Sequence, residues 1–328
     1  MFEALAIKEL KLIKDFDFQS LNELFDFLAP WNDQKELNGF IFRGHSQENY
    51  KLIPNALRPE NNEELWMYVN GGNVAREQTN HLSLQISAEF QLLREYYRLA
   101  DQQGLGVPTS SSLRKNLAQT FDAFGERHNH ERSTWIPEDL LESAALAQHY
   151  GIPTRLLDWT YDPYVAMYFA FQGALEYDGN IVIWALNKDH ISFLGNTVNR
   201  INVEFVTPHY ASNPNLNAQK GLFTHCPVPR LSGIEESQLM MKGQVQLVDR
   251  RPLDEIILEQ AKPEKNIDYF KRIILPATEA ARGIQVLESL GYGSSKIFPG
   301  YDGVAKQVLE RCKVANKSIQ LTAKAVVD

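Results

Sequence analysis

The chain has 328 residues, of which 44% are hydrophobic and 23% are charged, a composition that permits the core of one large or two medium globular domains. Its formal net charge of −8 argues against broad, sequence-independent binding to nucleic acids, which usually requires a basic surface. The two cysteines, Cys226 and Cys312, lie far apart in the sequence and suggest neither a disulfide framework nor a cysteine zinc site.

Apolar runs are short throughout the chain. The first residues contain no long apolar segment, and no later run approaches the roughly 20 apolar residues of a membrane-spanning helix. We therefore expect a cytoplasmic protein with no membrane association. No metal is expected, because the adjacent His225 and Cys226 are too weak a metal-binding pattern.

The N-terminal part predicts a strand followed by a capped helix. Residues 5–13 partly alternate between apolar and polar types and indicate a first strand. Ser20, followed three residues later by Glu23, is a capping box that opens a helix, and Pro30 stops that helix.

A second strand is predicted at residues 40–43. Its alternation places Phe40 and Phe42 on one face and Ile41 and Arg43 on the other. Arg43 therefore emerges at a strand end, next to the flexible Gly44.

Helices dominate the middle of the chain. After an expected mobile surface insertion at 60–80, apolar residues recur at the spacing of a long amphipathic helix. These residues are Ile86, Phe90, Leu93, Tyr97 and Ala100. Further helices are predicted near 113–124 and at 137–150, where Gly151 ends the second one.

The stretch 147–170, AQHYGIPTRLLDWTYDPYVAMYFA, is the most informative in the chain. It joins one helix to another through a short loop, and Asp162 with Pro163 opens the second helix as its N-cap and first helical residue. A loop held between rigid elements often carries function. The polar and aromatic residues of this loop are Thr154, Arg155, Asp158, Trp159 and Thr160.

The rest of the chain predicts scattered strands and two helices. Residues 187–216 indicate a long loop that approaches the site. The expected strands are 181–186, 221–224, 243–248 and 272–275, and the expected helices are 278–290 and 304–314. Because the strands do not alternate regularly with helices, we expect an α+β fold in which helices surround a small split or bent sheet.

Several segments together carry a family resemblance. The segment 41–59, IFRGHSQENYKLIPNALRP, and the stretch 147–170 strongly resemble the FRG domain, which is named for the tripeptide present here as Phe42-Arg43-Gly44. The pieces NAQKGLFT (217–224) and KIFPGYDGVA (296–305) fit as well. The resemblance implies an FRG domain at 20–312, between an N-terminal arm at 1–19 and a C-terminal tail at 313–328.

The order of these motifs is similar to that of ADP-ribosyltransferases. An arginine closes a strand, a small polar residue precedes an A-x-x-F helix, and a Gln or Glu comes late in the chain. The resemblance implies an ADP-ribosyltransferase-like sheet and NAD as a substrate. Arg43 is then expected to hold the phosphate and ribose on the nicotinamide side. Thr160 and Trp159 are expected to shape the nicotinamide pocket, and Gln219 to position the acceptor.

The remaining residues assigned to cofactor binding by this resemblance are Gly44, Thr154, Arg155 and Asp158. The sequence departs from the transferase pattern at two places. Asp158-Trp159-Thr160 stands where transferases often carry Ser-Thr-Ser, which leaves Thr160 as the best match. Gln219 in place of Glu removes a charge that could stabilise an oxocarbenium ion.

The residue types by themselves leave other interpretations open. The planar fork of donors on Arg43 suits a phosphate, but it equally suits a structural ion pair with Asp158. Gln219 could simply satisfy a strand end. Gln148 and His149 end a helix and could point into the same cleft. His149 is the best general acid–base candidate, because its unperturbed pKa lies near neutrality, although a structural histidine fits as well.

Three functions follow. The leading expectation is NAD-dependent ADP-ribosyl transfer to a protein or nucleic acid, in the setting of a toxin or antiphage effector with a regulatory or antitoxin partner. The first alternative is a catalytically silent module that binds a nucleotide or a protein. The second is a hydrolase that uses His149 and Asp158 as acid–base partners.

Overall fold

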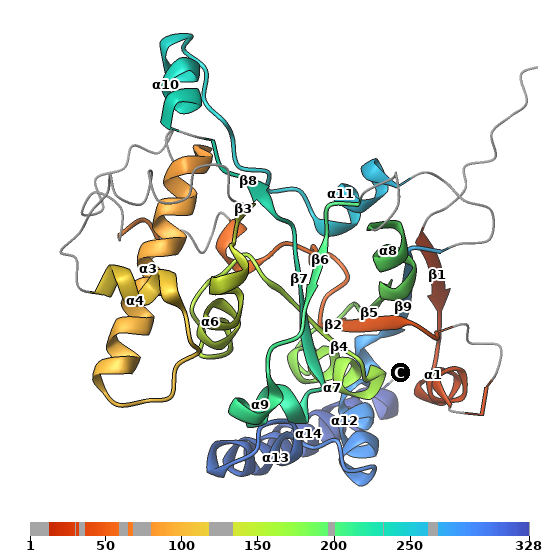
Figure 1. Ribbon diagram of the computed structural model, residues 1–328. Helices are drawn as coiled ribbons and strands as arrows, with labels where there is room; N and C mark the ends of the chain where they lie inside the picture. The colour runs from red at the N-terminus through yellow and green to blue at the C-terminus, as the bar shows by residue number, and fades with distance from the viewer. Residues whose placement is uncertain are drawn as a thin grey trace, which may run out of the picture.

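One mixed sheet organises the part of the chain that the computed structural model describes. That part comprises residues 13–29, 31–32, 37–58, 65–67, 80–117, 134–195, 201–231, 233–261 and 268–327. Within it, seven strands lie in the order β1-β9-β5-β2-β4-β7-β6 (Figure 1). They are β1 (Ile13–Asp17), β2 (Phe40–His45), β4 (Leu157–Thr160), β5 (Asn180–Asn187), β6 (Glu204–Val206), β7 (Gly221–His225) and β9 (Phe270–Pro276).

Pairing in this sheet is antiparallel except between β1 and β9, which are parallel. Two short strands, β3 (Thr134–Trp135) and β8 (Val228–Pro229), form a separate antiparallel pair. Helices pack around the sheet, so the expected mixture of strands with surrounding helices is confirmed, although the sheet has seven strands and is larger than expected.

Each face of the sheet has its own hydrophobic core. The first core joins the sheet to α1 (Leu21–Leu28), α7 (Pro163–Gly173), α12 (Ala280–Ser289), α13 (Ser294–Ile297) and α14 (Tyr301–Val327). The second joins it to α8 (Lys188–Gly195) and α11 (Leu253–Gln260). Alternate side chains of a strand point to opposite faces of the sheet and so enter different cores. In β2, Phe42 lies in the first core and Ile41 in the second, as the alternation predicts.

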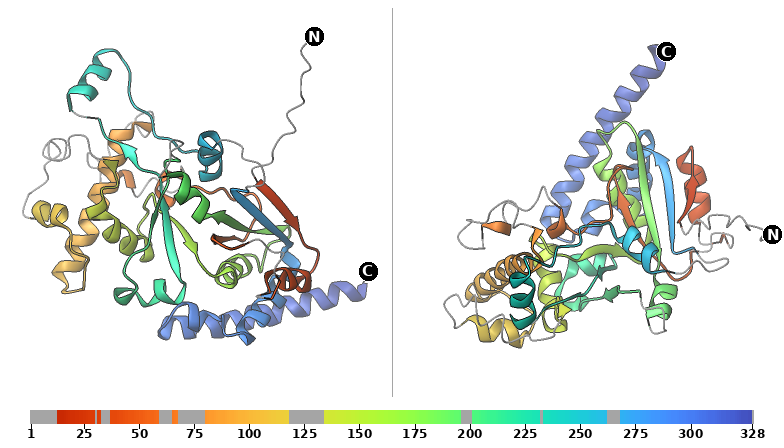
Figure 2. Two further views of the ribbon diagram at one scale, coloured as in Figure 1. Left: turned by 45° about the vertical axis from the view of Figure 1, so that its right-hand side comes forward. Right: turned by 90° about the horizontal axis from the view of Figure 1, so that it is seen from above.

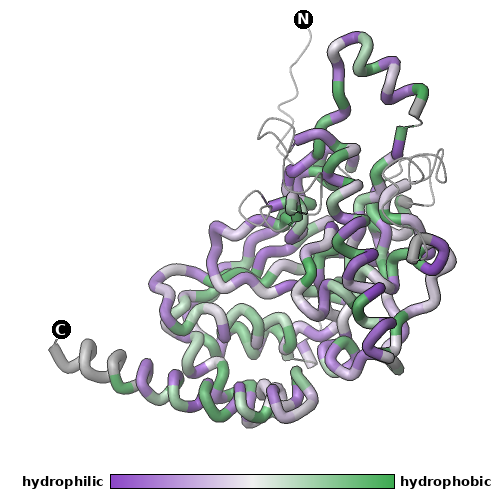
Figure 3. Tube along the Cα trace, turned by 90° about the vertical axis from the view of Figure 1, so that its left-hand side faces the viewer, coloured by the Kyte–Doolittle hydropathy of each residue, from purple (hydrophilic) through white to green (hydrophobic). Residues whose placement is uncertain are grey.

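A third core lies beside the sheet. It is built by α3 (Leu82–Gln102), α4 (Ser111–Leu117) and α6 (Glu138–His149). The smaller helices are α9 (Pro214–Ala218) and α10 (Gly233–Met241), with 3-10 turns at Asn55–Leu57, Tyr210–Ser212 and Ala277–Glu279. The end of α14 runs past the rest of the described chain, and Figures 2 and 3 show it from different sides. None of the described helices is both long and apolar enough to cross a membrane.

The helix starts that the sequence predicts are confirmed. The Ser20 side chain caps α1 by accepting a hydrogen bond from the backbone N–H of Glu23. The Asp162 side chain caps α7 by accepting from the N–H of Tyr164 at 3.0 Å, with Pro163 in the first turn. Asp162 thus fixes the start of the helix that follows β4.

Three sequence predictions in the central and later chain are wrong. Residues 157–160 form strand β4 rather than a loop, because they pair with β7 along their whole length. Residues 187–216 contain α8, β6 and α9 instead of one long loop. The predicted strand at 243–248 is absent: Val245 and Leu247 are exposed, and only Leu247 forms an isolated bridge, with His81.

Other predictions fall partly outside the described residues. Of the strand expected at 5–13 only Ile13 is described, and it begins β1. Of the surface insertion expected at 60–80, the described Leu65 and Trp66 are buried against α3, which contradicts a surface position for them. The helix expected at 304–314 continues through the predicted tail to Val327.

Strand β2 and helix α7 approach each other closely at Gly44. A Cβ atom at this position would lie 1.9 Å from the carbonyl oxygen of Ala166 and 2.8 Å from the backbone nitrogen of Ala170. Since backbone atoms cannot yield as a flexible side chain can, only glycine fits between the strand and the helix. Gly44 therefore has a packing role that is independent of any ligand.

We predict that Gly44→Ala lowers the free energy of unfolding by about 3 kcal/mol or more, because the added methyl group overpacks the contact between β2 and α7. Urea denaturation followed by circular dichroism measures this loss. Gly106→Ala is the matched control, since a Cβ atom there has nothing within 4 Å. Equal effects of the two substitutions would contradict the packing role of Gly44.

Candidate functional site

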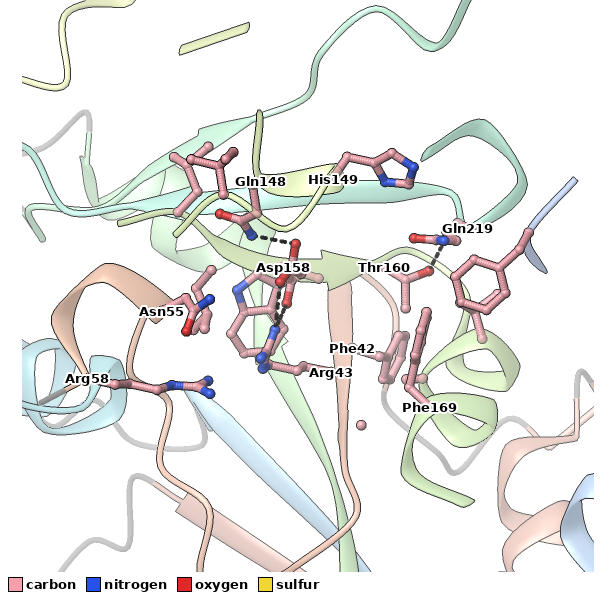
Figure 4. Close-up of a pocket in the computed structure, with 18 residues that line it drawn as sticks. Phe42, Arg43, Asn55, Arg58, Gln148, His149, Asp158, Thr160, Phe169 and Gln219 are labelled. Atoms are coloured by element: carbon pink, nitrogen blue, oxygen red, sulfur yellow. Dashed lines mark hydrogen bonds and ion pairs between the residues drawn. The ribbon is translucent and has the colours of Figure 1, made fainter. Parts of the chain in front are cut away.

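A pocket of about 420 Å³ lies where β2 and β4 separate, which is on the scale of a small-molecule site. Its walls come from β2, β4, α6, α7, the turn before β7 and the segment after α13 (Figure 4). The lining residues are Phe42, Arg43, Gly44, Asn55, Arg58, Gln148, His149, Ile152, Leu156, Leu157, Asp158, Trp159, Thr160, Val165, Ala166, Phe169, Gln219 and Phe298.

The separation of the two strands follows from their register. Strand β2 pairs with β4 only at Phe42–Thr160, whereas it pairs with β5 along all six of its residues, Phe40–His45. Strand β4 in turn continues along β7. The sheet therefore splits after Phe42, and the next residue of β2, Arg43, faces the gap.

Arg43 is fixed from two sides. Its Nε donates to Nε2 of His45 at 3.0 Å, and its Nη1 donates to the carbonyl oxygen of Asp158 at 2.8 Å and to Oδ2 of Asp158 at 3.4 Å. Among the described residues, the other terminal nitrogen, Nη2, has no hydrogen-bond partner. The pocket therefore contains a largely buried guanidinium with a donor edge still available.

Asp158 is held in turn by α6. Its Oδ1 accepts from Nε2 of Gln148 at 2.6 Å, and Oε1 of Gln148 accepts from the hydroxyl of Thr154. The Asp158 side chain remains 60% exposed, compared with 16% for Arg43. Thr154 thus supports the site through Gln148 and does not line the pocket itself.

His45 stands behind Arg43 as a neutral acceptor. Its side chain is almost fully buried. Burial, followed by the positive charges of Arg43 and Arg58, lowers the pKa of His45 to about 3. At neutral pH the imidazole therefore carries no charge, and its Nε2 can accept the Nε–H of Arg43.

A second guanidinium makes this end of the pocket cationic. Arg58 lines the pocket and donates through Nε to the carbonyl of Ile53 at 2.9 Å. Burial lowers the pKa of Arg43, Asp158 raises it, and the charge of Arg58 lowers it. Arginine stays protonated in proteins, so two cations face one carboxylate here. The local charge is thus opposite in sign to the net charge of the chain.

The other end of the pocket is apolar and aromatic. Phe169 of α7 and Phe298 lie edge to face, with ring centroids 6.0 Å apart. Both rings are only partly buried, whereas Phe42 and Val165 beside them are buried. Phe169 packs against the first core and also lines the pocket. Its ring and that of Phe298 could pack against a flat ligand group.

Gln219 reaches the pocket from the end of α9. Its backbone carbonyl accepts a hydrogen bond from the Thr160 hydroxyl at 2.6 Å, and its side-chain Nε2 donates to the carbonyl of Ile297 at 3.3 Å. The next residue, Lys220, has a positive φ of 47° and forms an ion pair of 2.7 Å with Asp162. The turn is thus tied to both β4 and α7.

Thr160 and Trp159 are placed differently from the transferase expectation. The Thr160 hydroxyl lines the pocket, but it already donates to Gln219 and accepts from the N–H of Asp162 at 3.0 Å. The Trp159 ring is buried in the second core, and its Nε1 donates to Thr224 at 3.0 Å. Trp159 still lines the pocket beside Phe169 and Phe298, but its ring packs in the second core.

Arg155 lies outside this pocket. Its Nε and Nη2 form a bidentate ion pair with Glu89 of α3, at 2.7 and 2.8 Å, and both side chains are buried. This position corrects the expectation that Arg155 contacts a cofactor, because its guanidinium is already satisfied within the third core.

His149 lies between the two ends of the pocket. Its Nε2 is 2.8 Å from Nδ2 of Asn215, and burial lowers the pKa of its imidazole, while Asp158 raises it. Within the described residues, His149 forms its hydrogen bond with Asn215 and Asp158 forms its own with Gln148 and Arg43. The acid–base pair of the hydrolase alternative therefore lacks a direct hydrogen bond.

The structure brings Arg43, Thr160 and Gln219 to one pocket, as the sequence predicts. Sequence reasoning did not identify four other residues as site residues: His45, Asn55, Arg58 and Phe298. All four stand in segments quoted for the family resemblance, which could have indicated them: His45, Asn55 and Arg58 in 41–59, and Phe298 in 296–305. In the described residues, no group of three or more His, Cys, Asp or Glu side chains could hold a metal ion.

Comparison with models of protein families matches residues 38–179 to the FRG domain. No curated protein and no solved structure matches the chain. The matched span contains β2, β4 and α7, and with them Arg43, Asp158 and Thr160. Gln219 and Phe298 complete the pocket from beyond that span.

The low pKa of His45 predicts acid sensitivity. Because the folded-state pKa is about 3 and the unfolded value is about 6.5, the unfolded chain binds the additional proton between these values. Folding stability therefore falls as the pH drops from about 6.5 towards 3, by at most about 5 kcal/mol from this group.

We expect His45→Gln, which keeps an acceptor for Arg43, to lose less stability than the wild type between pH 7 and pH 4. Urea denaturation at a series of pH values measures the two slopes. His209→Gln is the control, since the His209 side chain is 86% exposed. The same slope in wild type and His45→Gln would contradict the lowered pKa, because His45 would then bind its proton equally in the folded and unfolded states.

Proposed function

We propose, from the FRG domain that this chain carries and from the pocket built on it, that the protein binds NAD and transfers its ADP-ribosyl group to a macromolecule. The observation that carries the proposal is the open donor edge of Arg43. A guanidinium that is largely buried and only partly neutralised favours an anion, and phosphate is the anion that suits its planar fork.

The two ends of the pocket match the two chemical parts of such a ligand. Arg43 and Arg58 supply the cationic end for phosphate, and Phe169 and Phe298 supply the apolar end for a flat ring. A nicotinamide ring at the aromatic end would lie beside Gln219, so the bond between the ring and the ribose would be near the polar groups of the site.

The reaction then needs positioning and electrostatics rather than a protein nucleophile. The glycosidic bond breaks with its electrons passing to nicotinamide, and a nucleophilic atom of the acceptor attacks the oxocarbenium-like carbon of the ribose. The Gln219 amide would orient that acceptor. The proton that the acceptor loses would pass to His149, whose Nε2 would first give up its hydrogen bond with Nδ2 of Asn215.

An ADP-ribosyltransferase-like sheet belongs to this proposal. One support is the split between β2 and β4. The other is that Arg43 on β2, Thr160 before α7 and Gln219 before β7 line one pocket. A binding module without catalysis is the second candidate. It is favoured by the Thr160 hydroxyl, whose hydrogen bonds are made within the protein.

Gln219 separates these two candidates. In a transferase, Gln219→Ala should lower turnover by about 10²-fold or more, the scale for the loss of one positioned polar group, with NAD affinity changed much less. The assay uses NAD labelled in its adenylate part and follows the label on protein or nucleic acid. Saturable NAD binding without label transfer or hydrolysis in the wild type would support the binding module. Release of free ADP-ribose alone would support a hydrolase.

Arg43 tests the binding half of the proposal. Arg43→Lys should weaken NAD binding by about tenfold or more, because a point charge cannot replace the fork of donors. Calorimetric titration measures the affinity, and the exposed Arg282→Lys serves as the matched control. Unchanged NAD affinity in Arg43→Lys would show that the phosphate does not bind at Arg43.

A further inference from the structure

Any anion that reaches Arg43 binds beside a negative charge that is already there. The Asp158 carboxylate lies 3.4 Å from Nη1 of Arg43, and its side chain is largely exposed to the pocket. Figure 4 shows the Asp158 carboxylate between Gln148 and Arg43, on the side of the pocket towards Arg58 and Asn55. A ligand phosphate and Asp158 must therefore share one guanidinium.

This carboxylate is held in position by its neighbours. Gln148 donates to Oδ1 at 2.6 Å, and the Thr154 hydroxyl donates to Gln148. The Thr154 hydroxyl thus fixes the side-chain amide of Gln148, and that amide in turn holds Asp158. Because these hydrogen bonds hold the Asp158 carboxylate, it is a fixed part of the binding surface rather than a mobile counter-ion.

We infer that Asp158 makes the pocket select phosphates with a single negative charge that adjoin a hydroxyl-bearing sugar. That is the chemistry of a dinucleotide pyrophosphate, in contrast to the terminal phosphate of a nucleoside mono-, di- or triphosphate. The inference rests on the proposed nucleotide function of the pocket and goes beyond it, because it names the feature of the ligand that is selected and the residue that selects it.

The first reason is electrostatic. A bridging phosphate carries one negative charge, whereas a terminal phosphate carries close to two at neutral pH. At a separation of about 6 Å, the repulsion between the extra charge and a carboxylate weakens binding by roughly 3- to 100-fold, depending on how strongly solvent screens it. Arg43 and Arg58 attract the extra charge of a terminal phosphate, and Asp158 opposes that attraction. Removal of the Asp158 charge should therefore shift the preference of the pocket towards the terminal phosphate.

The second reason is hydrogen bonding. An ionised carboxylate accepts hydrogen bonds and cannot donate them. It can therefore pair with the hydroxyl groups of a ribose but not with a fully ionised phosphate. In a dinucleotide a ribose lies on each side of the pyrophosphate, so a phosphate at Arg43 brings ribose hydroxyls close to Asp158.

ADP-ribose and ADP form a matched pair of probes for this selection. They share the adenosine and both phosphates, but the distal ribose of ADP-ribose removes one negative charge and adds hydroxyl donors. We expect calorimetric titration of the wild type to show binding of ADP-ribose at least tenfold tighter than binding of ADP. Higher salt should narrow the gap, because it screens the repulsion.

Asp158→Asn removes the charge and keeps the shape of the side chain. The preference for ADP-ribose over ADP should shrink by roughly 3- to 100-fold in this variant, mainly because ADP binds more tightly. Asp178→Asn is the matched control at an 81% exposed carboxylate and should retain the wild-type preference. Thermal melting of each variant establishes that it is folded.

The inference is overturned if Asp158→Asn keeps the full preference, or if the wild type binds ADP as tightly as ADP-ribose. If neither ligand binds the wild type, the inference fails together with the nucleotide pocket of the proposed function. If the wild type binds selectively but transfers no label from NAD, the transferase proposal fails alone and the selection by Asp158 stands.

Discussion

A guanidinium buried where two strands separate is the constraint on which this site depends. Strands β2 and β4 share the single bridge Phe42–Thr160, and the next residue, Arg43, lies in the gap that opens beyond it. Burying a charge costs several kcal/mol unless the charge is paired and hydrogen-bonded. His45 and Asp158 pair and hydrogen-bond this charge only in part. Among the residues that the structure describes, none accepts a hydrogen bond from Nη2 of Arg43.

The surrounding structure keeps the gap at a fixed width. Gly44 lets β2 lie directly against α7 on one side of the split. On the other side, the Thr160 hydroxyl ties β4 to the carbonyl of Gln219, and the ion pair of Lys220 with Asp162 ties the same turn to the start of α7. Residues far apart in the sequence thus form one pocket with a cationic end and an aromatic end. This shape explains how an acidic chain can offer a site for an anionic ligand.

The sequence predicted those features of the site that depend only on residues close together in the chain. The alternation in β2 and the Asp162 cap of α7 are properties of neighbouring residues, and both are confirmed. The role of Arg155 was not predictable, because its partner Glu89 lies 66 positions away and only the tertiary fold brings them together. Residues 243–248 alternate like a strand, but in the described part of the chain they pair only through the isolated bridge at Leu247. Their apolar side chains are left exposed.

The proposed function depends on the binding of a phosphate at the open edge of Arg43. A crystal structure of the wild-type protein with ADP-ribose tests it most directly. We expect a phosphate oxygen within hydrogen-bond distance of Nη2 of Arg43, with the distal ribose directed towards Gln219. A ligand that binds elsewhere, or one that fills the pocket while Nη2 of Arg43 stays without a phosphate contact, would contradict it.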